Sequence, residues 1–195
     1  QHFYPEQFRI NDICFELVNK GHFVTILTGL PNYPYGKVLK DYKWFKNRNE
    51  DINGVKVKRC SLVGRGKSNI TMAINYMWFA IFGSIRALFM KKDFDVIYAY
   101  QLSPITMVWP AILIKKIKKI PLVINVLDQW PISVTAGGIK KTSLIYKILF
   151  KISKRVYQEA DKILISSRSF KKYFIEELKL NKEIKYIPQY AEKEY

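Results

Sequence analysis

The apolar positions of this chain alternate between a helical and an extended spacing. Residues 8–20 carry a helical stripe that ends at Gly21, and short runs rich in β-branched residues alternate with further helical stretches after it. The predicted strands cover residues 23–28, 55–60, 95–99, 122–126, 162–165 and 184–187, and the later predicted helices cover about 69–91, 105–119, 141–158 and 169–179. This alternation is typical of an α/β protein with a Rossmann-like, doubly wound parallel sheet.

Two features interrupt the regular alternation. The chain opens with the helix at 8–20, and since the first helix of a parallel α/β domain normally follows a strand, we expect a first strand before Gln1. Residues 29–53 form a long connection rich in Pro, Asn, Tyr, Gly and Trp. Connections of this length in a compact domain are usually functional or disordered. The turn Asn53-Gly54 then leads into the next strand.

Two predicted helices have unusual surfaces. Residues 69–85 contain no charge and are apolar on every side, a pattern that fits a helix buried in the protein, a helix lying in a membrane interface or, less well because a span needs about 20 apolar residues, a membrane-spanning helix. Residues 141–157 combine a basic face with an apolar face, which is predicted to point inward. The basic face fits ordinary solvation or attraction to anionic lipid. The predicted inner face consists of Leu144, Ile145, Ile148, Leu149, Ile152 and Val156.

The charge of the chain is strongly unbalanced. Its 195 residues include 33 Lys and Arg against 16 Asp and Glu, a formal net charge of +17, which favours nucleic acid, phosphorylated small molecules or an anionic membrane as partners. Lysine outnumbers arginine, so general surface attraction is favoured over bidentate recognition. Cys14 and Cys60 fall at apolar positions and suit a reducing compartment. His2 and His22 have no metal-ligand spacing around them.

Polar side chains follow several predicted strands where each strand ends. Gln101 and Ser103 follow the strand at 95–99, Asp128 follows the strand at 122–126, and Ser166 and Ser167 follow the strand at 162–165. Since parallel strands end at one edge of a sheet, these groups are expected to converge there, where open α/β proteins bind ligands. Helix capping explains the serines equally well, and an N-cap role is the alternative interpretation of Asp128. The chain contains no Walker or GxGxxG phosphate loop.

Several motifs together resemble the amino-terminal half of family-four glycosyltransferases. They are HFYPEQFRIND at 2–12, KGH at 20–22 and GLPNYPYGK at 29–37. Asp128-Gln129-Trp130-Pro131 resembles the Asp-Leu-Trp-Pro of the subgroup that adds sugars to lipid-linked precursors of capsule and O-antigen. Residues 186–190 resemble the segment where the first domain of these enzymes leads into the second. The resemblance covers essentially all 195 residues.

The resemblance implies one half of a GT-B fold. Residues 1–187 are then a Rossmann-like, acceptor-side domain and residues 188–195 the start of an interdomain linker, with the donor-binding domain absent from this chain. The parent is expected to be a hexosyl or acetamidosugar transferase of the retaining type, and this half alone is expected to be inactive. The parent enzyme is also expected to need no cofactor and no obligatory metal. Its expected substrates are a nucleotide-sugar and a polyprenyl-diphosphate-linked saccharide acceptor.

The resemblance also implies roles for particular residues. Asp128 is the expected catalytic residue, which accepts a hydrogen bond from an acceptor hydroxyl or acts as a base. Trp130 is expected to stack on a sugar, and Arg9, at the start of the first helix, to meet a diphosphate. The remaining expected acceptor- or donor-binding residues are Gln7, Asn32, Tyr33, Gln101 and Ser103. The chain departs from many relatives in having Gln7-Phe8-Arg9 in place of a Gly-Gly pair and no His before Asp128.

The expected location is the cytoplasm, with peripheral association to the inner face of the cell membrane through its anionic surface. Two other classes of protein remain open. One is a basic nucleic-acid-binding protein, although the lysines are spread over helix faces, no recognition module is present and nucleic acid is not an expected partner. The other is a non-catalytic membrane-docking or binding module.

Overall fold

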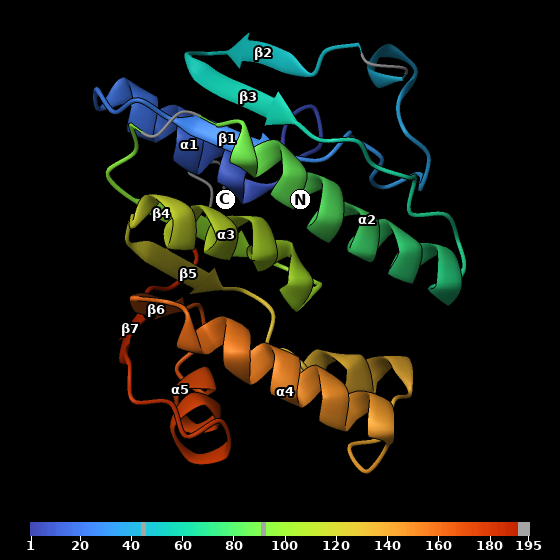
Figure 1. Ribbon diagram of the computed structural model, residues 1–195, viewed down its shortest axis with the longest axis vertical. Helices are drawn as coiled ribbons and strands as arrows, with labels where there is room; N and C mark the ends of the chain where they lie inside the picture. Colours follow the sequence, from blue (N-terminus) through green and yellow to red (C-terminus); the bar gives the residue numbers. More distant parts are fainter. Residues whose placement is uncertain (44–45, 91–92, 191–195) are drawn as a thin grey trace. The chain divides into compact units, whose positions relative to one another are not determined.

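The computed structural model describes residues 1–43, 46–90 and 93–190, and the chain divides into two compact units, Gln1–Met90 and Lys91–Tyr195 (Figure 1). Part of the expected connection at 29–53, the last residue of the expected helix at 69–91 and most of the expected linker at 188–195 lie outside the described residues.

The first unit is built on a small mixed sheet. Its elements are α1 (Arg9–Asn19), β1 (Thr25–Thr28), the 3₁₀ turn η1 (Lys40–Tyr42), β2 (Asn49–Ile52), β3 (Val55–Arg59) and α2 (Asn69–Leu88). The strand order is β1-β3-β2, with β1 parallel and β2 antiparallel to β3. The parallel pair follows the predicted pattern, whereas β2 falls inside the connection that was predicted to contain no strand.

Local turn chemistry explains the ends of several elements in this unit. Gly21 has φ +87°, and the backbone N–H groups of Gly21 and His22 donate to Val18 and Leu17, so α1 ends in a Schellman motif as its sequence predicted. Asn53 and Gly54 both have positive φ angles, which matches the tight hairpin that joins β2 to β3. The turn predicted at Asn53-Gly54 is therefore confirmed. The strand before it, β2, was not predicted, because its mostly polar residues show no alternation of apolar and polar side chains.

Helix α2 is apolar on two opposite faces. Its buried face contains Phe79, Ala80 and Gly83, while Ile70, Ile74, Met77, Ile81, Ile85 and Leu88 are exposed. Ser68 caps the helix by accepting from the Thr71 amide at 3.1 Å, in a capping box. No helix within the described ranges combines the length and the apolar character needed to cross a bilayer.

The second unit is a regular parallel α/β structure. Its strands are β4 (Ile97–Gln101), β5 (Leu122–Val126), β6 (Lys162–Ile165) and β7 (Glu183–Tyr186), all parallel and in the order β4-β5-β6-β7. The connections contain η2 (Ile105–Val108), α3 (Trp109–Lys118), η3 (Ile132–Gly137), α4 (Leu144–Gln158), α5 (Phe170–Lys172) and the π-helical turn η4 (Tyr173–Glu177). This is the α/β, Rossmann-like architecture that the sequence predicted.

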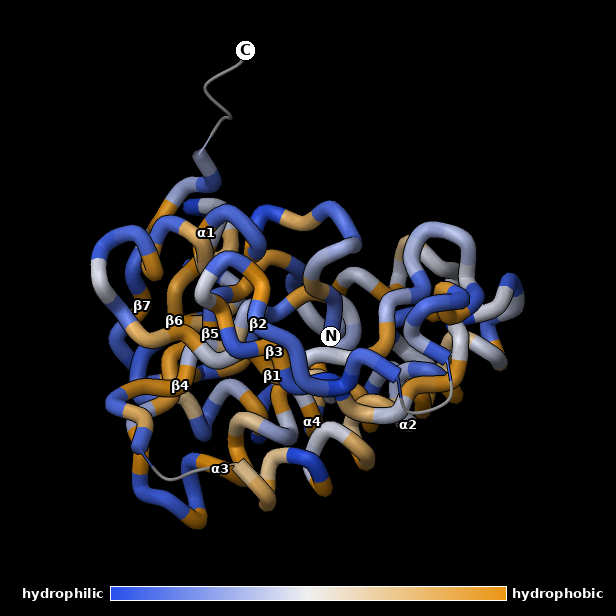
Figure 2. Tube along the Cα trace, turned by 90° about the horizontal axis from the view of Figure 1, so that it is seen from above, coloured by the Kyte–Doolittle hydropathy of each residue, from blue (hydrophilic) through white to orange (hydrophobic). Residues whose placement is uncertain are grey.

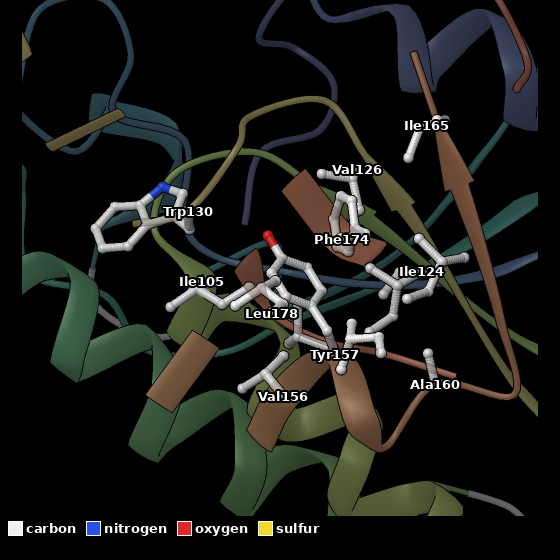
Figure 3. Packing of buried hydrophobic residues seen from close by; sticks show 14 of the residues in the cluster. Ile105, Ile124, Val126, Trp130, Val156, Tyr157, Ala160, Ile165, Phe174 and Leu178 are labelled. Atoms are coloured by element: carbon white, nitrogen blue, oxygen red, sulfur yellow. The ribbon is translucent and has the colours of Figure 1, made fainter. Parts of the chain in front are cut away.

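The core of the second unit lies between one face of the sheet and its connecting helices. Alternate residues of β5 and β6, such as Ile124 and Ile163, are opposite each other in register and fully buried. They pack in one cluster with Val156 and Tyr157 of α4 and with Phe174 of η4 (Figure 3). The apolar character of these strands, visible in the hydropathy colouring of Figure 2, is typical of parallel strands in a protein interior.

The structure corrects three details of the predicted elements. β4 begins two residues later than predicted and ends at Gln101 itself. The helices predicted at 105–119 and 169–179 begin as a 3₁₀ turn and as a single α-helical turn, respectively. The predicted inner face of α4 was wrong in part, because Tyr146, Val156 and Tyr157 fill the core, while Leu144, Ile145 and Ile148 are 73%, 58% and 49% exposed.

Candidate functional site

Asp128 lies at the carboxyl edge of the parallel sheet, two residues after β5, as its sequence position predicted. The Leu127 amide donates to the Gln101 carbonyl at 3.0 Å and extends the β4–β5 pairing to the start of the loop. Ser103 follows β4 along the chain, so the loops after two neighbouring strands meet at this edge. This is where open α/β sheets hold their ligands.

The Asp128 carboxylate is fixed through one of its two oxygens. Oδ2 accepts hydrogen bonds from the Ser103 hydroxyl and from the Trp130 indole Nε1 at 3.0 Å, and the indole nitrogen also lies 3.0 Å from the Ser103 Oγ. None of the residues that the structure describes donates to Oδ1, and Asp128 is half-buried rather than enclosed. The carboxylate is therefore held in one orientation, with one oxygen free to accept a hydrogen bond from a ligand.

A buried set of polar side chains holds the loop that carries Asp128. Gln101 is fully buried, its amide donates to the carbonyls of Leu102 at 2.6 Å and Asp128 at 3.0 Å, and its Oε1 accepts from the Tyr157 hydroxyl at 3.2 Å. The Tyr173 hydroxyl donates to the Trp130 carbonyl at 3.2 Å. Burial raises the pKa values of Tyr157 and Tyr173, so both hydroxyls stay protonated and act as donors.

These contacts change the roles expected for Trp130 and Gln101. The Trp130 side chain belongs to the apolar core at 8% exposure (Figure 3), whereas stacking on a sugar requires an exposed ring face. The Gln101 amide is already satisfied within the protein. Both residues therefore position the Asp128 loop. Ser103 is the predicted binding residue that contacts the carboxylate together with Trp130.

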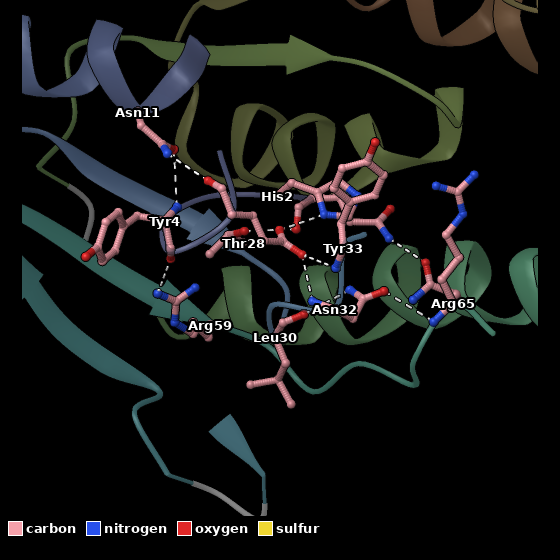
Figure 4. A network of polar contacts seen from close by, with 12 residues as sticks. His2, Tyr4, Asn11, Thr28, Leu30, Asn32, Tyr33, Arg59 and Arg65 are labelled. Carbon is pink, nitrogen blue, oxygen red and sulfur yellow. Dashed lines mark hydrogen bonds and ion pairs between the residues drawn. The ribbon is translucent and has the colours of Figure 1, made fainter. Parts of the chain in front are cut away.

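In the first unit, Glu6 is the centre of a second polar network, whose partners His2, Asn32 and Tyr33 are labelled in Figure 4. Its Oε1 accepts from the backbone amides of Asn32 and Tyr33 at 2.6 Å each, and its Oε2 lies 2.7 Å from the His2 Nδ1. Glu6 is only 4% exposed. The segment before α1 is thereby tied to the loop after β1, although the two are 26 residues apart in sequence.

The protonation of Glu6 reflects this environment. Burial alone would raise the pKa of the carboxyl group, but hydrogen bonding and charge from His2, together with the amides of Tyr33 and Asn32, outweigh burial and lower the pKa below its usual value. The carboxylate is therefore ionised at neutral pH. Sequence analysis did not select Glu6, although it lies in the HFYPEQF motif, because its partners come from a distant loop.

The structure places the other four predicted residues of the first unit differently from one another. Asn32 is fully buried, with its amide nitrogen donating to the Leu30 carbonyl at 3.0 Å and its Oδ1 accepting from the Arg65 amide at 3.2 Å, so it shapes the loop. Tyr33 is 43% exposed and packs on Phe8 with ring centroids 5.4 Å apart. The remaining two, Gln7 and Arg9, lie at the start of α1 and are exposed and half-buried, respectively.

The eight predicted residues thus fall into two groups. Gln101, Ser103, Asp128 and Trp130 gather at one edge of the second unit. Gln7, Arg9, Asn32 and Tyr33 belong to the first unit. In the described part of the chain, no group of three or more His, Cys, Asp or Glu side chains is arranged to hold a metal ion.

A parallel α/β unit with an oriented carboxylate at its carboxyl edge is typical of ligand-binding α/β domains. The comparisons with known proteins make the class specific. The family model described as Glycosyltransferase Family 4 matches residues 8–190, so the chain belongs to this family. A comparison with curated proteins gave no significant match. The function is therefore of the glycosyltransferase type.

Proposed function

We propose that this chain is the acceptor-binding half of a GT-B enzyme that transfers a hexosyl or acetamidosugar residue from a nucleotide-sugar, with retention of configuration. The proposed acceptor is a polyprenyl-diphosphate-linked saccharide used in the synthesis of a bacterial capsule or O-antigen. The family assignment supports glycosyl transfer. The observation that carries the acceptor-side role is the Asp128 carboxylate, which is fixed at one oxygen and open at the other.

Glycosyl transfer requires the acceptor hydroxyl to be held against the anomeric carbon of the donor while charge develops on the leaving diphosphate. In our proposal, Asp128 Oδ1 accepts the hydrogen bond of the acceptor hydroxyl and orients its oxygen for attack on the anomeric carbon. The new C–O bond forms as the bond to the nucleoside diphosphate breaks on the same face of the sugar, so that configuration is retained, and the hydroxyl proton passes to Asp128 or to the leaving diphosphate. Ser103 and Trp130 keep the carboxylate from rotating. The chemistry at this position needs no metal ion.

In the first unit, the proposed ligand groups are the phosphates of a substrate. Arg9 stands at the first position of α1, where the free backbone N–H groups of a helix favour an anion, and Gln7 is exposed beside it. Tyr33 contributes an exposed ring, and Glu6 holds its loop in place. We also propose that the protein associates peripherally with the inner face of the cell membrane, where a lipid-linked acceptor is located.

The decisive experiment replaces Asp128 by Asn in an enzyme that contains both this chain and a donor-binding domain. Because Ser103 and Trp130 both donate to the Oδ2 position, they select the amide oxygen of Asn there, and the amide nitrogen takes the Oδ1 position. A donor at that position cannot accept the hydrogen bond of a hydroxyl. We expect sugar transfer to fall about a hundredfold or more, with unfolding unchanged.

The matched control is Asp95→Asn, the same chemical change at an exposed position in the second unit. It should leave transfer unchanged. If Asp128→Asn transfers sugar at the rate of this control, Asp128 only holds its loop through Ser103 and Trp130, because the amide oxygen of Asn accepts both of these hydrogen bonds. The assay follows label from a nucleotide-sugar into the lipid-extractable saccharide.

A further inference from the structure

A surface formed by the first half of α4 and the turn before it combines exposed aliphatic side chains with exposed lysines. We call it the α4 patch, and its residues are Lys140, Lys141, Leu144, Ile145, Lys147, Ile148 and Lys151. The three aliphatic side chains are between 49% and 73% exposed. The opposite side of α4 fills the core, so the aliphatic residues of the patch are not the edge of the hydrophobic interior.

The charge of the α4 patch is uncompensated. Residues 129–158 contain six Lys and Arg and no Asp or Glu. None of the six forms an ion pair with a residue in the described ranges, whereas Lys115, Lys116 and Lys162 elsewhere in this unit each pair with an acidic side chain. The patch therefore presents a positive field around an apolar centre.

We propose that the α4 patch docks on the surface of an anionic lipid bilayer. An amphipathic helix that lies in a membrane interface buries aliphatic side chains at the headgroup boundary and keeps lysines at the level of the anionic headgroups. The α4 patch provides both components on one helix face. This inference deepens the proposed function, since it names the surface that brings Asp128 to a lipid-linked acceptor.

Charge and shape favour lipid over the other partners that a basic surface can bind. A nucleic acid would neutralise the lysines, but it would leave Leu144, Ile145 and Ile148 without an apolar partner, and no aromatic side chain in the patch is placed to stack on a base. In a twofold dimer, the patch would face its own copy and bring like charges together. Of these three partners, only a bilayer satisfies the lysines and the aliphatic residues at once.

An open hollow of about 390 Å³ adjoins the patch in the connection between η3 and α4. Lys140 and Lys141 line it together with Thr135 and Thr142. Positive side chains and hydroxyls suit the phosphate of a lipid headgroup. The hollow therefore adds Thr135 and Thr142 to the polar groups beside the patch lysines.

The test measures co-sedimentation of the 195-residue chain with vesicles of phosphatidylcholine alone and of phosphatidylcholine mixed with phosphatidylglycerol. We expect binding to the anionic vesicles only, weakened by salt because surface charges are screened. The charge variant replaces Lys141, Lys147 and Lys151 by Gln. Each lysine near an anionic surface contributes about fivefold to binding, so the variant should bind roughly a hundredfold more weakly.

A second variant separates a bilayer from a purely electrostatic partner. Leu144→Gln with Ile148→Gln keeps every lysine and uses a good helix former at exposed positions. Insertion of these side chains into the lipid boundary predicts a loss of vesicle binding of at least about tenfold. Binding of duplex DNA, measured in the same buffer, should be weak in the parent chain and insensitive to this variant.

Each variant has a matched control in the same unit. Lys171, Lys179 and Lys185 are exposed lysines outside the α4 patch, and their joint replacement by Gln removes the same charge. Ile117→Gln with Ile175→Gln removes two aliphatic side chains that are 50% and 49% exposed. Both controls should bind vesicles like the parent chain, and circular dichroism should show the same fold for all variants.

The proposal is overturned if neutral and anionic vesicles bind equally, if a control loses as much binding as its test variant, or if the aliphatic variant binds normally. It is also overturned if the charge variant weakens DNA binding or self-association but leaves vesicle binding unchanged. Vesicle binding is independent of transfer activity. If docking fails while Asp128→Asn still abolishes transfer, only the docking surface is wrong, and the proposed function stands.

Discussion

The Glu6 network allows a quantitative prediction for the variant Glu6→Gln. The wild-type carboxylate belongs to a residue that is only 4% exposed, and it accepts two backbone N–H groups at 2.6 Å and contacts His2 at 2.7 Å. The glutamine side chain has the same shape and retains one carbonyl oxygen for the two amides. It lacks the negative charge, and its amide nitrogen faces the His2 ring.

The expected cost follows from the change in these three contacts. A hydrogen bond to a charged group contributes about 1.5–3 kcal/mol, and a neutral one about 0.5–1.5 kcal/mol, so each contact loses about 1 kcal/mol. The summed loss from the three contacts is partly offset, because burying a neutral amide costs less free energy than burying a carboxylate. We therefore expect Glu6→Gln to lower the free energy of unfolding by about 2–3 kcal/mol at pH 7.

The pH dependence has a defined sign. Because the pKa of Glu6 is lowered on folding, its carboxylate contributes stability at pH values above the usual pKa of a glutamate, and this contribution is lost as the pH falls through the lower folded-state pKa. The difference in unfolding free energy between the wild type and Glu6→Gln should therefore be constant near neutral pH. It should shrink in the acidic range below that value.

The assay is denaturant unfolding at neutral and acidic pH, with Glu16→Gln as the matched control. Glu16 makes an exposed pair with Lys20 at 3.5 Å in α1, and pairs of this kind contribute at most about 0.5–1 kcal/mol. The reasoning is refuted if Glu6→Gln and Glu16→Gln are equally stable at pH 7. The reasoning is also refuted if the difference in unfolding free energy between the wild type and Glu6→Gln grows as the pH is lowered, because a buried carboxylate with a lowered pKa predicts the opposite.

Two further predictions concern buried groups elsewhere. Tyr157→Phe removes the donor to the buried Gln101 Oε1 and should cost about 1–3 kcal/mol in denaturant unfolding, whereas Tyr146→Phe, whose hydroxyl makes no hydrogen bond to a described residue, should be nearly neutral. Burial raises the pKa values of Cys14 and Cys60 to about 12, so both thiols should resist a thiol reagent at pH 8 until denaturant is added. Rapid labelling of the folded chain would contradict their buried placement.

The sequence by itself predicted the elements whose bounds are determined by neighbouring residues. The bounds of β5 and β6 agree with their β-branched runs, α1 ends at the glycine that its sequence indicated, and the alternation of strands with helices predicted the parallel sheet. Asp128 could be placed at the carboxyl edge for the same reason, because the end of a strand in a parallel sheet determines the edge at which the next residue lies.

The tertiary structure decided where polar groups find partners. β2 is a strand because its backbone pairs with β3, although its side chains show no apolar alternation. Glu6 is buried because the loop after β1 brings two amide donors to it. Trp130 and Gln101 are buried, and their hydrogen-bond partners Ser103 and Tyr157 come from other elements.

Helix α4 shows the division between sequence and tertiary structure most clearly. Its sequence determined a helix with apolar and basic residues, but apolar side chains occur on more than one side, and periodicity cannot choose which side faces the core. The packing of Tyr146, Val156 and Tyr157 made that choice. Leu144, Ile145 and Ile148 were left exposed, because a helix can bury only one face against a single sheet layer.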